Sequence, residues 1–549
     1  MKLYKIKTTA IIFAGCMLVL LSCKKQLDVI NPNEPTLEVT KSETGVVGFA
    51  NGVVYKNGFN HVDVVTLNWL GDSYFSVCYG FHELMADVVA AEAANQSINV
   101  VNLPDYVIYD NGTRQNNTAS SKDAFRLVNS RDNRPQNPVY YEWAYMYVMN
   151  SNLNVLLDLI DQASFSGDAD IKKNTLKAWA YWWKGYAYSR IGSLYYAGIV
   201  TDIGLEGSRV SLYQAHDKII EESNKNFDKA KDILTALSAG DDYTSVVGRL
   251  IPSFCQTGHG GVLTPAMWLR NINTMKARNL LANKRTKDMS AADWNALLAL
   301  ANDGVISGDF VFTGRTTNAN GFMSAGGGSA QILATGDPAG STYKMSERFI
   351  QEYKTGDKRL ANNFETLGSP YLNQVGGFTF STEHELLDGG SGLAGVVTLS
   401  NSTPGDFELY IAASYEENEL MKAEANIYLD NLNTGLTSVD AVRQYQGAGI
   451  AAVSGTGLTP AQAKEELRRE RRVALVFRGL SFYDYRRWGI IDDVSEGGGR
   501  TGCVVIESTG HKNTNATINY NFLDYWDVPD DETKLNPPAE GSAPVKNPN

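Results

Sequence analysis

The chain has 549 residues and a formal net charge of −12, and 43% of its residues are hydrophobic. A globular chain of this length and composition can bury a large apolar core. Its acidity argues against a nucleic-acid or anionic-lipid partner, because such surfaces attract uncompensated positive charge. The five cysteines are Cys16 and Cys23 near the N-terminus and the widely separated Cys78, Cys255 and Cys503. This spacing indicates neither a disulfide framework nor a cysteine-based zinc site.

The N-terminal segment has the pattern of a secretion signal. Three lysines precede an apolar run over residues 10–21, and Ser22 and Cys23 follow it. A run of about a dozen apolar residues is too short to span a bilayer, which takes about 20. The cysteine directly after Ser22 predicts a bacterial lipobox, with residues 1–22 as signal peptide and Cys23 as the lipid attachment site. A plain signal peptide with an incidental cysteine, or a simple membrane anchor, is the alternative.

The next part of the chain is expected to change from tether to helix to loop. Residues 23–44 include two prolines among polar residues and predict an extended tether. Helical patterns follow, the clearer one over residues 74–94 with Phe81, Leu84 and Val88 on its apolar face. Residues 95–138 are rich in Asn, Ser and Asp and predict a long polar loop, and such loops in compact proteins are often functional.

Helical patterns then return in pairs of about 34 residues, the length of tetratricopeptide-like units. The expected helices cover residues 139–163, 171–196, 212–238, 264–284 and 407–430. In the second of them, small residues such as Ala178 and Gly185 alternate with large aromatics, which lets a neighbouring helix approach closely. Residues 301–405 are Gly-rich and predict a loop-rich insertion with one helix near 343–359, and residues 491–549 predict an irregular C-terminal tail.

Residues 459–489 are the most distinctive stretch of the chain. Thr459 and Gln462 have capping-box spacing, and Pro460 stands at the first helical position, where its missing N–H costs nothing. The helical pattern is expected to loosen at Gly479. An aromatic-rich run follows and ends near Trp488.

This stretch also holds seven arginines: Arg468, Arg469, Arg471, Arg472, Arg478, Arg486 and Arg487. One interpretation is a phosphate-binding strip, because arginine binds phosphate through a bidentate fork. The other is an ion-paired, ring-stacked face that holds a terminal helix against the body. Glu465, Glu466, Glu470 and Asp484 interrupt the positive charge and favour the structural interpretation.

At these residues the chain resembles a known family. The runs ELRRERRVALVFRG at 466–479 and FYDYRRWG at 482–489 are similar to the signature segment of the SusD/RagB family, outer-membrane nutrient-binding lipoproteins of Bacteroidota. The Leu27-Asp28 pair after the lipid cysteine and the closing run at 520–526 resemble the family too. The family usually has a carboxylate where Arg478 stands, so a different local ion pairing is expected here.

The resemblance implies a mainly α fold. In it, tetratricopeptide-like helix pairs form a right-handed scaffold within a single SusD-like domain over residues 45–549. The helical core would comprise 45–300 and 406–490, with the insertion at 301–405 and the tail at 491–549. A TonB-dependent, SusC-like transporter is the implied partner. The implied location is the outer membrane, with the lipid anchor on Cys23 and the protein facing the cell surface.

A search for catalytic motifs finds none. His82-Glu83 and His384-Glu385 begin like zincin helices, but the required second histidine is absent at both places. The Gly-Gly-Gly runs at 326–328 and 497–499 lack a Walker lysine, and the chain has no G-x-S-x-G sequence. We therefore predict no catalysis, no cofactor and no metal site.

Rings and amides in polar segments are the candidate ligand-binding groups. An aromatic face stacks on the apolar face of a sugar ring, while Asn and Arg side chains hydrogen-bond its hydroxyls. The resemblance implies that ligands lie on the loops after the first helices and in the insertion. The candidates are Tyr106, Tyr109, Arg114, Asn116 and Asn117 in the first loop, and Tyr371 and Phe378 in the insertion.

The predicted function is therefore nutrient binding, with an oligosaccharide as the expected ligand, and delivery to the transporter. One alternative is a peptide-binding member of the same family. The other is a lipoprotein glycosidase, which would need two carboxylates roughly 5 to 9.5 Å apart across a groove.

Overall fold

The computed structural model describes residues 39–55, 78–91, 97–205, 207–315, 343–373, 380–387 and 408–549. The predicted signal peptide, Cys23 and Phe378 lie outside these ranges. Within them, none of the helices combines the length and the apolar character needed to cross a bilayer.

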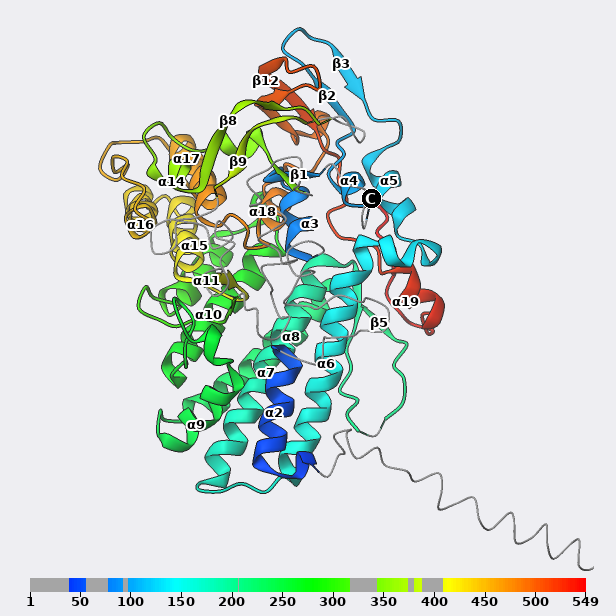
Figure 1. The fold of residues 1–549 in the computed structure, drawn as a ribbon, viewed down its shortest axis with the longest axis vertical. Coiled ribbons are helices and arrows are strands. Elements are labelled where there is room, and N and C mark those ends of the chain that lie inside the picture. Colours follow the sequence, from blue (N-terminus) through cyan, green and yellow to red (C-terminus); the bar gives the residue numbers. More distant parts are fainter. Residues whose placement is uncertain are drawn as a thin grey trace, which may run out of the picture.

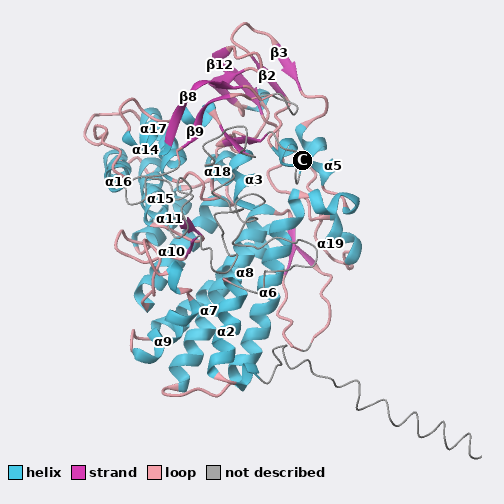
Figure 2. Ribbon diagram, in the orientation of Figure 1, coloured by secondary structure: helices cyan, strands magenta, loops and turns pink. Residues whose placement is uncertain are grey.

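The fold is mainly helical, as predicted (Figure 2). The longer helices are α2 (Glu43–Val54), α6 (Pro138–Gln162), α7 (Ala169–Leu194), α8 (His216–Thr235), α9 (Asp241–Leu250), α10 (Pro265–Ala282), α11 (Ala291–Asn302), α15 (Tyr415–Tyr428), α16 (Leu432–Tyr445) and α17 (Pro460–Ala474). Neighbours in the chain pack together, α6 on α7, α7 on α8 and α15 on α16, which confirms the predicted helix pairs (Figure 1).

Small residues on α7 set how closely α8 approaches. A Cβ added to Gly185 would lie 2.7 Å from the ring of Phe227, and one added to Gly192 would lie 2.9 Å from Ile220. Both partners belong to α8. The aromatic residues of α7 fill the flanks, and Trp182 and Trp183 are completely buried. The alternation of small and large residues therefore builds this helix pair.

Short helices and strands surround the helical body. The short helices are α3 (Gly80–Leu84), α4 (Ile98–Val101), α5 (Ser121–Val128), α13 (Glu347–Ile350), α14 (Lys358–Asn363), α18 (Ser481–Arg487) and α19 (Asp530–Leu535). Antiparallel two-stranded pairs are β1 (Val89–Ala91) with β7 (Tyr343–Met345), β4 (Ala197–Ile199) with β5 (Tyr213–Ala215), β6 (Thr313–Arg315) with β10 (Glu408–Tyr410), and β8 (Phe364–Tyr371) with β9 (Thr382–Leu386).

One four-stranded antiparallel sheet lies at the upper end of the molecule in Figure 1. Its order is β11-β12-β2-β3, formed by β11 (Arg500–Ile506), β12 (Lys512–Asn519), β2 (Tyr106–Ile108) and β3 (Arg114–Asn116). An isolated bridge between Ser381 and Ile506 connects β11 to the segment that leads into β9. The N-terminal loop region, the insertion and the C-terminal tail therefore meet at this end.

Several sequence predictions were wrong in detail. Within the range 74–94, which was expected to be one helix, the structure has α3, which ends at Leu84, and then strand β1. Residues 95–138 form β2, β3 and short helices instead of one long loop, and the tail contains β11, β12 and α19. At the start of the helices expected over 212–238 and 407–430, the structure has strands β5 and β10, and α8 and α15 follow them. Within 343–359, the expected helix is limited to the short α13. For β1, β2 and β10, pairing with strands far away in the sequence decided the local structure.

The start of the segment 459–489 has the predicted local structure, whereas its helix ends before the break predicted at Gly479. Thr459 and Gln462 form a reciprocal capping box with Pro460 in the first turn. The helix ends at Ala474, and Gly479 has a φ of +64°, which an L side chain rarely adopts. A Cβ at this position would also lie 2.7 Å from the ring of Tyr79. The glycine thus turns the chain into α18.

The arginines of this segment are structural. Arg487 donates to Glu424 of α15 and, at 2.8 Å, to Asp484. Arg471 of α17 donates to both oxygens of Asp484, at 2.9 and 3.0 Å. Arg486 instead donates to three main-chain carbonyls, at Ser193, Ala282 and Asp524. Of the set, Arg471, Arg472, Arg486 and Arg487 are buried.

We expect Arg487→Ala to destabilise the fold strongly. The substitution strands the carboxylate of Glu424, which is fully buried, and removing one partner of a buried pair costs about 3–5 kcal/mol. Chemical denaturation monitored by circular dichroism measures this loss. Arg469→Ala on α17 is the matched control, because its 3.4 Å pair with Glu465 is partly exposed and is worth less than about 1 kcal/mol. Equal stabilities for the two variants would contradict the structural role.

Candidate functional site

Three of the predicted ligand residues lie together on the β2–β3 hairpin. Tyr106 on β2 pairs across the strands with Asn116 on β3, and Arg114 is two residues before Asn116 on the same face. The guanidinium carbon of Arg114 lies 3.6 Å from the centroid of the Tyr106 ring. Its Nε donates to Oδ1 of Asn116 at 2.7 Å. We call Tyr106, Arg114 and Asn116 the hairpin cluster.

The hairpin is fixed to the rest of the sheet. Strand β12 pairs with β2, with Asn519 opposite Tyr106. The carboxylate of Asp110, in the hairpin turn, accepts main-chain N–H bonds from Thr514 at 2.8 Å and Asn515 at 2.9 Å. These bonds lower the pKa of Asp110, and the bond from Thr514 has the larger effect. The cluster therefore stands on a held strand pair rather than on a free loop.

Tyr109 and Asn117 have supporting positions in the same hairpin. The Tyr109 hydroxyl donates to the side chain of Gln115, and burial raises its pKa to about 12, so the hydroxyl remains protonated. Oδ1 of Asn117 accepts the N–H of Thr118 at 2.8 Å, while its Nδ2 is buried without a partner in the described chain. Gln115 was not among the candidates. Its place between Arg114 and Asn116 on a strand would have shown that it faces the other side of the sheet.

Tyr371 lies at the end of β8, opposite Thr382 of β9. The ammonium of Lys344 is 4.8 Å from the centroid of its ring. The Ser381–Ile506 bridge links β9 to the sheet that carries the hairpin cluster, so Tyr371 belongs to the same end of the molecule (Figure 1). The structure places both predicted regions at one end, while Phe378 falls outside the described residues.

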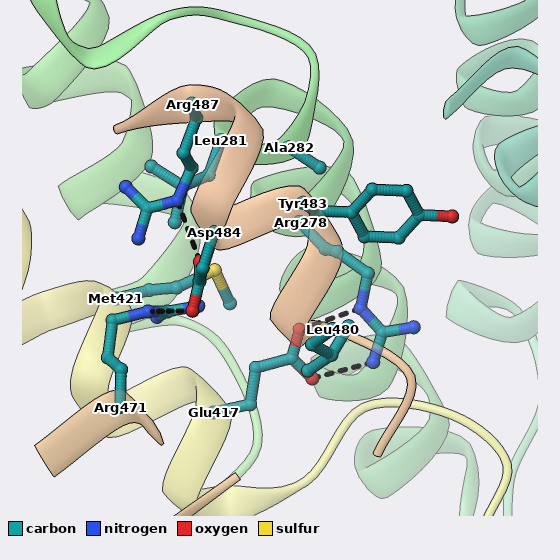
Figure 3. A pocket seen from close by; sticks show the side chains of 10 residues that line it. All are labelled: Arg278, Leu281, Ala282, Glu417, Met421, Arg471, Leu480, Tyr483, Asp484 and Arg487. Atoms are coloured by element: carbon teal, nitrogen blue, oxygen red, sulfur yellow. Dashed lines mark hydrogen bonds and ion pairs between the residues drawn. The ribbon is translucent and has the colours of Figure 1, made fainter. Parts of the chain in front are cut away.

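Figure 3 shows a cavity between the segment 459–489 and helices α10 and α15. It is too small for a nutrient. Its volume is about 10 Å³, which is room for about one water molecule. Arg278 and Glu417 form a bidentate pair at its wall, with both bonds at 2.6 Å. Arg471 also lines the cavity, and its Nη1 is buried without a hydrogen-bond partner among the described residues.

The buried titratable groups are structural as well. His82 lies 3.2 Å from Glu142, which also accepts from Arg190, and all three are buried. Burial lowers the pKa of His82. Although burial alone would raise the pKa of Glu142, the charge of Arg190 lowers it to about 2. Without solvent access, this cluster has no substrate to protonate.

Glu83 joins α3 to the turn before α18. Its carboxylate accepts the N–H of Gly479 at 3.0 Å and the hydroxyl of Ser481 at 2.8 Å. Burial raises its pKa to about 7, against the opposing effect of these two bonds. Across the described ranges, no three His, Cys, Asp or Glu side chains are grouped as metal ligands.

Comparison with known proteins agrees with this architecture. Residues 415–541 match the sequence model of the SusD family. A SusD-like protein from Bacteroides fragilis shares 14% identity and a TM-score of 0.56, over 91% of this chain and 97% of that one. A SusD-like carbohydrate-binding protein from the same organism shares 14% identity and a TM-score of 0.55, over 90% and 99%. Bacteroides fragilis NanU shares 12% identity and a TM-score of 0.53, over 84% and 92%. No curated protein matches the sequence.

The chain thus has a mainly helical, SusD-like fold. The C-terminal part of the chain, residues 415–541, matches the SusD family, and the chain as a whole shares the fold of SusD-like solved structures.

The raised pKa of Glu83 predicts a pH-dependent contribution to stability. A carboxyl group with a pKa of 4.5 when unfolded and about 7 when folded stabilises the fold fully below pH 4.5, and this contribution is lost as pH rises through 7. Glu83→Gln should remove that dependence. As the pH rises from 5 to 8, the free energy of unfolding of the variant should therefore increase relative to that of wild type by on the order of 3 kcal/mol. Urea denaturation at several pH values measures the difference. Glu365→Gln, at an exposed position of β8, is the control. Parallel curves for wild type and Glu83→Gln would refute the assignment.

Proposed function

We propose that the chain is a cell-surface lipoprotein that binds an oligosaccharide and delivers it to a SusC-like, TonB-dependent transporter. The observation that carries the proposal is the hairpin cluster, where a half-buried ring lies beside an exposed guanidinium and an exposed amide at one end of a SusD-like scaffold. The carbohydrate-binding description of one solved protein with this fold supports the same class of ligand.

The cluster has the chemistry for a sugar. Arg114 covers one face of Tyr106, so the ring holds the guanidinium plane in a fixed position. Only Nε of Arg114 bonds to Asn116, which leaves its Nη groups for sugar hydroxyls. The amide N–H₂ of Asn116 supplies further donors, and the remaining aromatic surface accepts the apolar face of a pyranose. Arg114 and Asn116 would select hydroxyl positions, while Tyr106 orients them.

We propose binding without catalysis. Hydrolysis of a glycosidic bond needs two carboxyl groups that face each other, one of them a proton donor. Asp110 and Glu507 beside this sheet accept hydrogen bonds from Thr514, Asn515 and Asn513. Such bonds hold a carboxylate in place and suit structural support better than proton transfer.

One feature favours a peptide as the second candidate ligand. Strand β3 is the last strand of the sheet, so one of its edges is not paired with another strand of that sheet. An extended peptide adds to such an edge through main-chain hydrogen bonds. A glycan array and a peptide array probed with the same protein distinguish the two ligands.

We expect a loss of affinity when the hairpin cluster is truncated. Tyr106→Ala and Arg114→Ala should each weaken binding of the best ligand from the array by on the order of 1–3 kcal/mol, by analogy with ring stacking on bases. Tyr109→Ala and Tyr371→Ala test the remaining described aromatic candidates. Calorimetry measures the affinities.

Tyr181→Ala is the matched control, because Tyr181 on α7 also has a cation near its ring, Lys229 at 5.1 Å, but lies on the helical body. Wild-type affinity in every hairpin variant would show that the ligand binds elsewhere.

The predicted lipobox makes Cys23→Ala a test of anchoring. The chain is acidic, so it has little attraction to anionic membranes, and we expect the variant to leave the membrane fraction. Fractionation of cells followed by a carbonate wash measures the distribution. Cys78→Ala, which removes a buried cysteine far from the lipobox, should remain in the membrane fraction. Persistence of Cys23→Ala in the washed membranes would contradict lipid anchoring at this residue.

A further inference from the structure

A groove on the helical body, separate from the hairpin cluster, has the features of a second ligand site. Its volume is about 440 Å³, within the range of small-molecule pockets, which is about 300–1,000 Å³. We call it the α15–α17 groove. The residues that line it come from α15, α17, the end of α18 and the 3₁₀ turn Thr286–Asp288, and they are Thr286, Lys287, Glu424, Tyr428, Ala461, Lys464, Glu465, Leu467, Arg468 and Trp488.

Two aromatic side chains in the groove are held rigidly. Tyr428 stacks on the buried ring of Trp294, with centroids 4.4 Å apart and planes 12° apart. Trp488, at the end of α18, has the guanidinium of Arg487 4.8 Å from its ring. Arg487 is itself fixed by its buried ion pairs. A ligand that stacks on Trp488 therefore meets a ring that loses little freedom on binding.

The charges of the groove are unequally compensated. Glu424 is neutralised by Arg487, and Glu465 accepts from Arg468 at 2.7 and 2.8 Å. Arg468 also pairs with Glu352, so the guanidinium groups are saturated with carboxylates. In contrast, Lys287 and Lys464 are exposed and have no carboxylate partner within the described chain. The groove thus carries two ammonium groups without a carboxylate partner among the described residues, and one of them, Lys464, lies over the Tyr428 ring.

The aromatic groups also provide hydrogen-bond donors. Neither the indole N–H of Trp488 nor the hydroxyl of Tyr428 bonds to a described residue. Burial raises the pKa of Tyr428 to about 12, so its hydroxyl remains a donor at neutral pH. Lys464 also lies 4.3 Å from the Tyr428 ring centroid, which places its ammonium directly beside this hydroxyl-bearing ring.

We propose that the α15–α17 groove binds an anionic saccharide, a pyranose that carries a carboxylate. Trp488 stacks on the apolar face of the ring, and Tyr428 and the indole N–H bond to hydroxyls. Lys287 and Lys464 bind the carboxylate. A phosphorylated ligand fits less well, because the forked arginine donors that suit phosphate are already occupied by carboxylates.

The test uses the full chain and two trisaccharides with the same linkage. The probe is α-1,4-linked trigalacturonate, and its fully methyl-esterified form is the uncharged counterpart with the same sugar ring. Calorimetry should show tighter binding of trigalacturonate at about 0.05 M salt than at about 0.5 M, because salt screens exposed charges. Trp488→Ala should weaken this binding at least about fivefold, and Trp488→Phe should weaken it less because a ring remains. The double variant Lys287→Gln/Lys464→Gln should lose the salt dependence.

Lys218→Gln, an exposed lysine of α8, controls for the loss of positive charge. The proposal concerns a different surface from the hairpin cluster, so Tyr106→Ala should leave trigalacturonate binding unchanged. The exposed lysine substitutions keep the test valid if Trp488→Ala does not fold. The proposal is overturned if the two trisaccharides bind equally well or if trigalacturonate does not bind. It is also overturned if Tyr106→Ala abolishes trigalacturonate binding while the lysine variants retain it.

Discussion

Arg487 and Glu424 form an ion pair in which the two side chains are 1% and 0% exposed. A buried charge without its partner costs several kcal/mol, so α18 and α15 must both be in place before either is stable. Glu352 has the same role at the other end of the segment, where Arg468 and Arg472 of α17 and Arg500 of β11 surround it. Through these carboxylates, one helical segment connects the helix pairs to the strand-rich end that carries the hairpin cluster.

The parts that could be predicted from the sequence depend on local spacing. The capping box at Thr459 and Gln462 and the turn at Gly479 follow from residues within a few positions of one another. The structural role of the arginines was predictable from the acidic residues among them, but most of their partners were not. Arg478 illustrates the limit, because it pairs with Glu416 at 2.9 Å, 62 residues away in the chain, and lies over the ring of Tyr410.

The strands and the arrangement of the site depended on contacts that sequence periodicity does not reveal. Tyr106 lies beside Asn519, more than 400 residues later, and three-residue strands are too short to show a period of two. Composition identified Tyr106, Arg114 and Asn116 as separate candidates, and only the strand register shows that they form one cluster. The α15–α17 groove was missed because Tyr428 and Trp488 are 60 residues apart and Lys464 resembles any exposed lysine on a charged helix.

Arginine and lysine side chains in residues 459–489 occupy different environments, because their charged groups differ in hydration and geometry. A guanidinium group makes several hydrogen bonds in one plane and is weakly hydrated, so it tolerates burial against carboxylates, as Arg471 and Arg487 show. An ammonium group is strongly hydrated and stays at the surface, as Lys464 does on the same helix as Arg471. The arginines are therefore used to build the scaffold, and Lys464, the one lysine of this segment, stays at the surface. Within this segment, the distribution of Arg and Lys separates the face that holds the fold together from the face that meets solvent.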